Sequence, residues 1–468
     1  MRVRFASFAS FGTYAAVGTL ALLLSGALPS PTVGQRDPSG ALSGDGRFTM
    51  ALTGDAIITR ALSPYKEPAF LRMIELIRSA DVAFTNLEIL LHDYEPYPAA
   101  SSGGTWMRAE PAMAAELAWA GIDIVSMANN HTGDYGPDGM RLTQKYAAGA
   151  GILTAGVGED LYEAREAKFL ETNDGRIALI SVASTFTNHS VAAPPRGGVR
   201  GRPGLNPLRI ESTRGLRSDH MEELRETLRS IGQEVSEPGQ PLNVFGTRLV
   251  AAEETGVRTA PDDRDMEQIA GVVRSAARLA DYVLVTIHAH NQAEYLNTFA
   301  RAMIDAGADA FVGHGPHYLT GIEIYRGKPI LYSLGDFIFQ NETLLRLPYD
   351  NYEPYDIADD MTRWVADFNA ARYADDTRGF PARPEIWESV VAVPTFQGER
   401  LVSLELHPIT LGFGQPASVR GRPMLADAEL GRKIIEDLIE RSRSYGTVIE
   451  WEGDRGIGVV RLGAQSAR

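Results

Sequence analysis

The chain has 468 residues, of which 44% are hydrophobic and 22% are charged, a composition typical of globular proteins and not of disordered ones. Its formal charge of −15 argues against a general affinity for nucleic acid. There is no cysteine, which excludes disulfide scaffolds and thiolate metal sites, so any metal must be bound through oxygen and nitrogen.

Residues 1–35 have the pattern of a secretory signal peptide. Arg2 and Arg4 form a basic head, residues 5–28 carry no charge, and a small polar segment follows. The alternative is an uncleaved N-terminal membrane anchor, although the Ser, Thr and Gly content makes a poor permanent span. We expect an exported protein of the cell envelope, periplasmic or extracellular, and exclude this segment from the fold.

From Phe48 onward, short apolar runs alternate with patterns of helical spacing. The expected strands are 48–54, 80–86, 121–128, 176–184, 282–287, 308–313 and 328–334. The expected helices are 67–80, one that begins at Asp138, 218–231, 264–280 and 295–307. This alternation predicts an α/β fold with a largely parallel central sheet.

Three regions depart from the alternation. Residues 186–217 are rich in Gly, Pro and Arg and are predicted to form a loop. Residues 345–385 are aromatic, acidic and irregular. The C-terminal part contains strand-like runs at 388–396 and 401–409, a helical pattern at 427–444 and a last strand near 456–462, which predict a second sheet or a mixed sheet edge.

Five expected strands end in side chains that can titrate or bind a metal. These side chains are Asp55; Asn86 and Glu88; Asn129, Asn130 and His131; His288 and His290; and His314 and His317. The carboxyl ends of parallel strands share one edge of a sheet, where the ligand crevices of α/β proteins form. We therefore expect these residues to converge on one site.

Carboxylates, an amide oxygen and imidazoles suit Mn²⁺, Fe²⁺, Zn²⁺ or Mg²⁺, as one ion or two. Two such ions can clamp an oxyanion and lower the pKa of a bound water, and a nearby His that is not a ligand can protonate a leaving group. No Ser/His/Asp triad signature, Walker loop or GxGxxG fingerprint competes with this interpretation.

Each residue alone also has an ordinary structural explanation. Asp55 could be a turn residue, and Asn86 or Asn129 could cap a helix or satisfy loop backbone. His290 alternates with His288 and could contact the metal ligands without binding the metal itself. The remaining histidines are assigned structural roles: His92, His189, His220 and His407. The coincidence across five strand ends favours a site.

Several stretches occur in the order of a known family. They are "LTGDAIITR" (52–60), "ADVAFTNLE" (80–88), "GIDIVSMANNHTGDYGPDG" (121–139), "GILTAGVGEDLYEAR" (151–165), "VLVTIHAH" (283–290) and "GADAFVGHGPHYLTGIEIYRGKPILYSLGDFIF" (307–339). The chain thereby resembles the CapA-type capsule (poly-γ-glutamate) synthesis family of the metallophosphatase, or calcineurin-like phosphoesterase, superfamily. The likeness covers about 47–340, and residues 420–442 resemble the family's C-terminal extension.

The resemblance implies a four-layer α/β/β/α sandwich. Residues 45–345 would form the metallophosphatase domain, with an insertion at about 186–265, and residues 346–468 would complete the sandwich. The implied metal ligands are Asp55, Glu88, Asn130, His288, His314 and His317. His131 would be the metal-adjacent acid, and the substrate would contact Arg60, Asn86, Asn129 and His290.

The sequence departs from the family pattern at several positions. Ile57 stands where the superfamily usually has a His ligand, and Gly315 where many members have the first His of His-Pro-His. Ala289 and His290 replace an aromatic residue and a Gly, and Asp336 stands where Asn is common and is treated as a structural turn. The number of metals and the ligands of a second one are therefore open.

The resemblance implies a metal-dependent hydrolase that acts on an anionic polymer such as poly-γ-glutamate. One alternative is a non-catalytic factor that binds the polymer or a membrane-bound synthase complex, which the incomplete first motif supports. Another is a secreted phosphodiesterase or nucleotidase. Arg196, Arg200, Arg202 and Arg209 could attract a polyanion or form a solvated loop.

Overall fold

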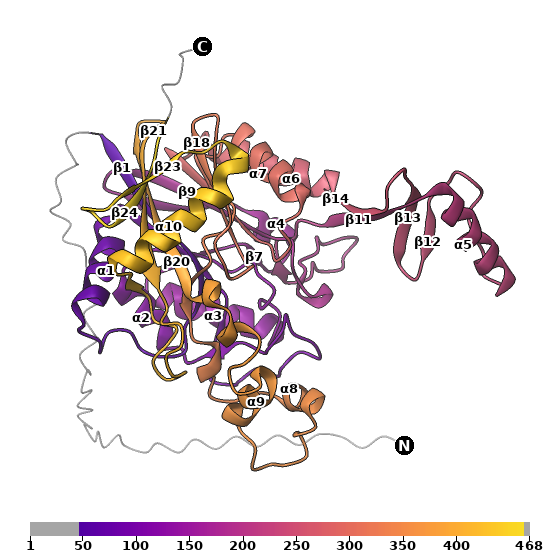
Figure 1. The fold of residues 1–468 in the computed structure, drawn as a ribbon, viewed down its shortest axis with the longest axis horizontal. Helices are drawn as coiled ribbons and strands as arrows, with labels where there is room; N and C mark the ends of the chain where they lie inside the picture. The colour runs from indigo at the N-terminus through magenta and orange to yellow at the C-terminus, as the bar shows by residue number, and fades with distance from the viewer. Residues whose placement is uncertain (1–45, 463–468) are drawn as a thin grey trace, which may run out of the picture.

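The computed structural model describes residues 46–462, which form a main body with a projecting arm and a small lobe (Figure 1). The expected signal segment, 1–35, lies outside the described residues. Between residues 46 and 462, no helix is long and apolar enough to cross a bilayer. The body is built on two large β-sheets.

The first sheet has β1 (Arg47–Ile57) near its centre. On one side lie the parallel strands β2 (Val82–Leu87), β5 (Ile124–Ser126) and β6 (Leu153–Ala155). On the other side lie the antiparallel strands β20 (Glu388–Gln397), β21 (Arg400–Thr410), β24 (Ile457–Val460) and β23 (Ile449–Glu452), with β22 (Met424–Leu425) paired to β21. β19 (Asp336–Phe339) pairs with the carboxyl end of β1 and places Asp336 opposite Asp55.

The second sheet has four parallel strands in its middle and an antiparallel strand at each edge. Its order is β17 (Ile322–Tyr325), β18 (Lys328–Leu331), β16 (Ala310–His314), β15 (Tyr282–His288), β9 (Gly175–Ala183) and β8 (Lys168–Thr172). The last residues of β15 and β16, His288 and His314, are paired in register. Both imidazoles therefore leave the sheet at the same edge.

One apolar layer joins the two sheets. Leu52 and Phe84 of the first sheet belong to the same fully buried cluster as Leu284 and Val312 of the second. The helix α10 (Ala428–Ser442) contributes Ile434, Ile435 and Leu438 to this layer. Side chains of strands buried on both faces form nearly continuous apolar runs, which is why these strands could be recognised in the sequence.

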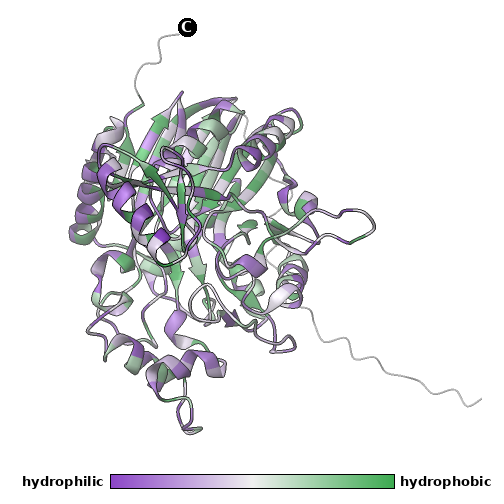
Figure 2. Ribbon diagram, turned by 90° about the vertical axis from the view of Figure 1, so that its right-hand side faces the viewer, coloured by the Kyte–Doolittle hydropathy of each residue, from purple (hydrophilic) through white to green (hydrophobic). Residues whose placement is uncertain are grey.

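Helices cover the two outer faces. The first sheet packs against α1 (Pro68–Ser79), α2 (Met113–Ala120) and α3 (Gly136–Gly149), and the second against α6 (Asp263–Ala276) and α7 (Glu294–Asp305). In α1 the buried residues Phe70, Met73, Ile74 and Ile77 share one helical face. Figure 2 shows hydrophobic strands inside and hydrophilic residues on the outward helix faces. The mixed α/β class predicted from the sequence is confirmed.

The arm comprises residues 210–261 (Figure 1). Its sheet contains β12 (Leu242–Val244), β13 (Thr247–Ala251), β11 (Ile210–Leu216) and β14 (Gly256–Pro261), and its helix is α5 (Ser218–Ser230). A small core of its own holds the arm together: Met221, Leu228, Leu242 and Leu249. The prediction of a loop over 186–217 was wrong for β11, because its strand partners lie far along the chain and its own side chains are mostly exposed.

The lobe comprises residues 341–387. It contains α8 (Tyr349–Tyr352), α9 (Val365–Tyr373) and 3-10 turns at Asn341–Thr343, Glu353–Tyr355, Phe380–Ala382 and Pro384–Trp387. The lobe returns to the body through Phe380, whose ring packs against Phe339 of β19 at 5.2 Å between centroids. The remaining short elements are β3 (Leu90–Leu91), β4 (Arg108–Ala109), β7 (Val157–Gly158), α4 (Leu161–Arg165), β10 (Gly204–Leu205) and the 3-10 turns Asn188–Ser190 and Arg443–Tyr445.

Candidate metal centre

The carboxyl ends of strands from both sheets meet at one buried place. Asp55 lies near the end of β1, Glu88 directly after β2, and His288 and His314 at the ends of β15 and β16; all four are fully buried. His288 Nε2 lies 3.6 Å from Glu88 Oε1, and His314 Nδ1 lies 3.5 Å from Asp55 Oδ1. Residues that are 200 or more positions apart in the chain therefore face one another.

Asp55 is surrounded by imidazoles. One of its oxygens lies 3.7 Å from His288 Nδ1 and the other 3.7 Å from His317 Nδ1, in addition to the contact with His314. Burial acts to raise the pKa of Asp55, but these three histidines outweigh burial and hold the pKa well below its usual range. The Asp55 carboxylate is therefore kept ionised, the form that binds a cation.

The pKa of Glu88 is shifted in the opposite direction to that of Asp55. Its Oε1 lies 3.9 Å from both His131 Nε2 and His317 Nε2, and neither carboxylate oxygen has a hydrogen-bond partner although both are buried. Burial raises the pKa of Glu88 well above its usual value, and the charge of Asp55 adds to this effect. A buried carboxylate without a donor, among imidazole nitrogens, is the arrangement that a cation would satisfy.

His288 and His314 face each other through their Nδ1 atoms at 3.1 Å, and His288 Nε2 lies 3.1 Å from Nε2 of the exposed His290. Burial lowers the pKa of His288 and lowers that of His314 to about 3, so both rings are neutral. Neutral imidazole is the form that ligates metals. His314 Nε2 is buried and has no partner.

His317 has a φ of 64°, which is uncommon for a residue with a side chain and is typical of functional sites. Its Nδ1 lies 2.8 Å from Asp336 Oδ1. Burial acts to lower the pKa of His317, but Asp336 and Asp55 outweigh it and raise the pKa. Burial raises the pKa of Asp336 to about 7, against the effect of His317. Asp336, expected to be a structural turn, thus lies within the cluster.

The turn after β5 carries His131 and Asp134. His131 Nδ1 lies 2.7 Å from Asp134 Oδ2, and because a carboxylate only accepts, the Nδ1 proton is donated to it and Nε2 is left to face Glu88. The backbone N–H groups of Met107 and Gly103 also donate to Asp134. Sequence reasoning missed Asp134; its spacing of three residues from His131 within one turn is the signal that could have found it.

The neighbouring amides hold the cluster together. Asn86 Nδ2 donates to Asp55 Oδ1 at 2.7 Å, and Asn129 Nδ2 donates to Asn86 Oδ1 at 3.3 Å. Asn129 Oδ1 accepts the backbone N–H of His131. Both amides were predicted to contact substrate; in the structure their hydrogen bonds orient Asp55 and the His131 turn. Asn130 differs, since its Oδ1 is buried without a partner.

Two glycines permit the close packing of this site. A Cβ on Gly103 would lie 2.4 Å from the Asn130 carbonyl oxygen, and the Gly103 carbonyl accepts from Asn130 Nδ2. Gly315 has a φ of 114°, and a Cβ there would lie 3.0 Å from the backbone nitrogen of Ala289. A His at position 315 would be strained in this backbone, and His314 offers an imidazole one position earlier.

Two other residues singled out in the sequence lie apart from this cluster. The Arg60 guanidinium donates to the backbone carbonyls of Ser418 and Arg420. These contacts favour a structural role over the expected contact with substrate. Ile57 is part of the apolar core under α1 and provides no ligand atom.

The donor set fits a divalent cation. Three overlapping groups of side chains could each hold a metal ion, because the ligand atoms within each group lie within 4.8 Å of one another. The groups are Asp55, His288 and His314; Glu88, His288 and His290; and Asp55, His317 and Asp336. The oxygen and nitrogen donors suit Mn²⁺, Fe²⁺, Zn²⁺ or Mg²⁺. The buried atoms of Glu88 and His314 that lack any partner are the structural sign that a ligand belongs here.

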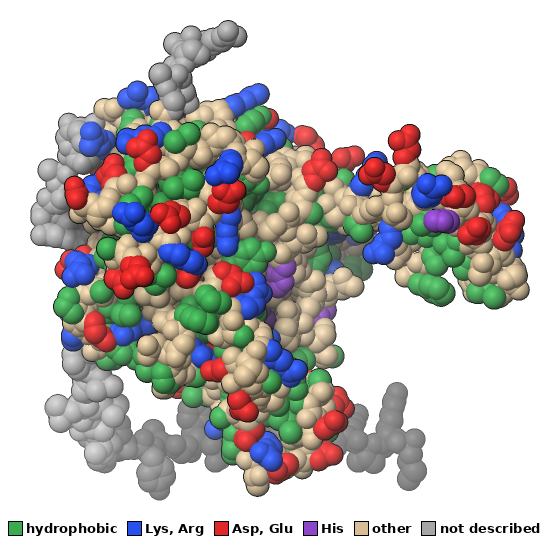
Figure 3. All heavy atoms as spheres, viewed as in Figure 1, with side chains coloured by type: hydrophobic (Ala, Val, Ile, Leu, Met, Phe, Trp, Pro, Cys, Tyr) green, Lys and Arg blue, Asp and Glu red, His purple; other side chains and the backbone are tan. Residues whose placement is uncertain are grey.

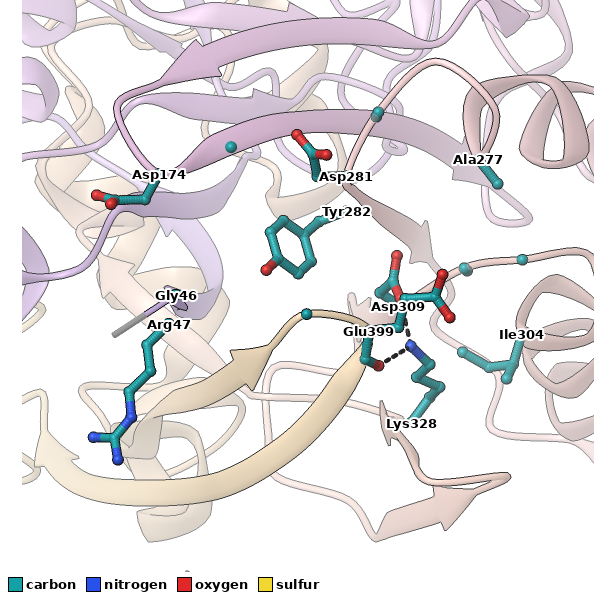
Figure 4. Close-up of a pocket in the computed structure, with 15 residues that line it drawn as sticks. Gly46, Arg47, Asp174, Ala277, Asp281, Tyr282, Ile304, Asp309, Lys328 and Glu399 are labelled. Carbon is teal, nitrogen blue, oxygen red and sulfur yellow. Dashed lines mark hydrogen bonds and ion pairs between the residues drawn. The ribbon is translucent and has the colours of Figure 1, made fainter. Parts of the chain in front are cut away.

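A cavity of about 910 Å³ lies elsewhere in the body (Figure 4). It lies at the opposite edge of the sheets, where Arg47, Tyr282 and Lys328 begin or lie near the start of their strands. Lys328 Nζ donates to Asp309 and to the Glu399 carbonyl inside it. No candidate site residue lines this cavity, so its size does not bear on the metal centre.

Residues 49–341 match the model of the family described as bacterial capsule synthesis protein PGA_cap. An uncharacterized protein of Sinorhizobium fredii is 38% identical over 442 residues, which is 89% of this chain and 93% of the relative. A capsule biosynthesis protein CapA of Bacillus anthracis is 24% identical over 307 residues, 63% of this chain and 60% of the relative.

A probable polyglutamine synthesis accessory protein of Mycobacterium tuberculosis is 28% identical over 216 residues, 46% of this chain and 44% of the relative. Among solved structures, one described as a novel phosphatase of Mycoplasma pneumoniae aligns with 78% of this chain and 94% of its own at 12% identity and a TM-score of 0.35. A TM-score that low supports no argument about this chain.

Proposed function

The chain belongs to the family of bacterial capsule synthesis proteins, and on that premise we propose that it is an exported, metal-dependent hydrolase of the cell envelope. The names of the Bacillus and Mycobacterium relatives point to capsule and polyglutamine synthesis. We therefore take poly-γ-glutamate, or a similar anionic polymer, as the material on which it acts, in concert with a membrane-bound synthase.

One observation carries the proposal: the Glu88 carboxylate is fully buried, has no hydrogen-bond donor, and faces imidazole nitrogens of His288, His131 and His317 at 3.6 to 3.9 Å. Leaving such a group unpaired in a folded protein costs about 1–3 kcal/mol, and more when it is charged. A purely structural role does not explain why an unpaired carboxylate is present where five strand ends meet.

The residues that would hold the cation are Asp55, Glu88, Asn130, His288, His314 and His317, with His290 and Asp336 beside them. A divalent ion bound there supplies Lewis-acid polarisation of a phosphoryl or carbonyl oxygen and lowers the pKa of water. His131, in its protonated form, is placed to give a proton from Nε2 to a leaving group, because Asp134 fixes its Nδ1. Asn86 and Asn129 keep Asp55 and the His131 turn in position.

We also assign the body to the four-layer α/β/β/α sandwich of the metallophosphatase type. Its support is the single apolar layer between the two sheets, with α1 to α3 outside one and α6 and α7 outside the other. The strands β20 to β24 extend the sheet of β1, which supports the inclusion of the C-terminal residues in the same domain.

A non-catalytic assembly factor is the second candidate, and Ile57 favours it. This residue stands where the superfamily pattern has a metal-binding His, and its side chain is 2% exposed within the apolar core. In that case the fold would bind polymer or a synthase, and the cluster would hold a structural cation.

Hydrolysis of a chromogenic phosphodiester by the purified full chain separates the two candidates. We expect the wild type to show Mn²⁺-dependent turnover. Glu88→Gln should lose both turnover and bound metal. His131→Asn should lose turnover but keep the metal. His220→Asn, in the exposed helix of the arm, is the matched control and should leave turnover unchanged. Metal binding without turnover of any phosphoester or γ-glutamyl substrate would overturn the hydrolase and leave the assembly factor.

A further inference from the structure

The lobe brings arginines close to the aromatic rings that pack on the metal centre. The ring of Phe380 packs edge-on against that of His317, with 5.3 Å between centroids, and the Arg372 guanidinium lies 5.9 Å from the Phe380 centroid. Arg372 lies near the end of α9. Only the ring of Phe380 separates it from His317. Figure 3 shows His side chains at the surface between the body and the lobe, with basic side chains beside them.

Arg372 also contacts the opposite wall of the site. Its Nη1 donates to the hydroxyl of Thr105, which is buried. The residue before Thr105 is Gly104, where a Cβ would lie 3.7 Å from His131 Cε1. Arg372 thus bridges the segment that covers His131 and the ring that covers His317.

Arg383 is a second lobe arginine close to His317. Its guanidinium lies 5.7 Å from the ring centroid of Tyr318, the residue after His317, and its charge is near enough to act on His317. The side chain is 46% exposed and is paired with Glu385 through Nε at 2.9 Å. The terminal nitrogens of Arg383 therefore remain available at the surface.

The charge of Arg372 is not neutralised locally. Within residues 46–462 it forms no ion pair with a carboxylate, and its hydrogen bond goes to an uncharged hydroxyl. The fully buried arginines among residues 46–462 pair with carboxylates; Arg420, for example, binds Glu342 and Asp376. The half-buried Arg60 and Arg441 donate to backbone carbonyls, as Arg372 donates to a hydroxyl. An unpaired, partly buried guanidinium beside a metal centre is a site for an anion.

Two of the four arginines singled out in the 186–265 insertion have partners within the chain. Arg209 Nη1 pairs with Asp265 at 2.8 Å, and Arg202 Nε donates to the carbonyl of Val191. Arg202 and Arg209 are therefore engaged within the chain, whereas Arg196 and Arg200 are exposed.

We propose that Arg372 and Arg383 bind a second anionic group of the substrate molecule whose scissile bond lies at the metal centre. This inference rests on the proposed function of that centre. The guanidinium plane recognises carboxylate and phosphate alike, so the substrate is an oligoanion with further carboxylates or phosphates beyond the reacting group. The lobe, through these two side chains, selects charged polymers over small neutral esters.

Binding of defined polymers to the full, Mn²⁺-loaded chain tests the inference without any need for turnover. The probes are fluorescent γ-linked glutamate oligomers, which carry carboxylates, and inorganic polyphosphate. The double variant Arg372→Gln/Arg383→Gln should bind one of them about tenfold more weakly, as expected for the loss of two solvent-screened ion pairs. The polymer that is affected identifies the anion.

Arg363→Gln is the matched control, since this lobe arginine pairs with Asp360 and Asp367 and should bind as the wild type does. Metal content and thermal unfolding of the double variant should equal those of the wild type, which shows that the lobe is folded. Wild-type affinity in the double variant, or no binding of either polymer by the wild type, would overturn the inference. Failure to hydrolyse any substrate would count against the hydrolase alone.

Discussion

Replacing Glu88 by Gln should change the stability of the protein in opposite directions with and without metal. In the metal-free chain both oxygens of Glu88 are buried without a donor, and its pKa is raised by burial and by the carboxylates of Asp55 and Asp336. The ionised side chain is therefore unfavourable in the fold. Gln keeps the shape and removes the charge, so it relieves this penalty.

The size of the effect follows from the environment of the carboxylate. A buried acceptor without a partner costs about 1–3 kcal/mol, so metal-free Glu88→Gln should be more stable than the wild type by about that amount near neutral pH. A ligand at about 100 times its Kd adds about 2.7 kcal/mol to the wild type, provided that it binds only the folded chain. Glu88→Gln should lose most of this gain.

Unfolding followed by circular dichroism, once with EDTA and once with saturating Mn²⁺, measures both effects. The metal-free difference should shrink at acidic pH, where Glu88 is protonated in the folded and unfolded chain alike. Glu226→Gln, an exposed change in the arm, should match the wild type in both buffers. A Glu88→Gln protein that is less stable than the wild type in EDTA, or equally stabilised by Mn²⁺, would refute the reasoning.

Three further changes test the parts of the site. His131→Asn should lower phosphodiester turnover about 100-fold or more while metal content is unchanged, because a general acid contributes about 10²–10⁴-fold; an equal loss in His189→Asn would contradict this. Asp134→Asn should lower turnover and reduce the free energy of unfolding in denaturant by about 1–3 kcal/mol, because it weakens the hydrogen bonds to His131 and to the backbone N–H of Gly103. Unchanged turnover would show that Asp134 does not orient His131. Gly103→Ala should weaken metal affinity in a titration, because its Cβ would displace the Asn130 backbone; wild-type affinity would count against this role for the turn.

The meeting of distant strand ends could be predicted because it follows from two simple features of the sequence. Apolar runs marked the strands, and a coordinating side chain followed each run at the same relative place. Asp55, Glu88, His288 and His314 lie where that rule puts them. The helices that cover the sheets were equally accessible, since α1 and α6 bury one face at regular spacing.

What the sequence did not predict depends on non-local geometry. β11 has a weak side-chain pattern and is a strand only because it pairs with β13 and β14 of the arm. The hydrogen bonds of Asp134 and Asp336 depend on the backbone angles of turns, which no spacing rule specifies. The place of Arg372 depends on how the irregular lobe folds back over the site through Phe380.

The most direct test of the central claim is the metal content of the purified full chain, measured by elemental analysis beside an Asp55→Asn/Glu88→Gln double variant. We expect at least one equivalent of Mn, Fe, Zn or Mg in the wild type after loading and dialysis, and a loss of most of it in the variant. A wild-type protein that retains no more metal than the folded double variant would contradict the claim that these strand ends hold a cation.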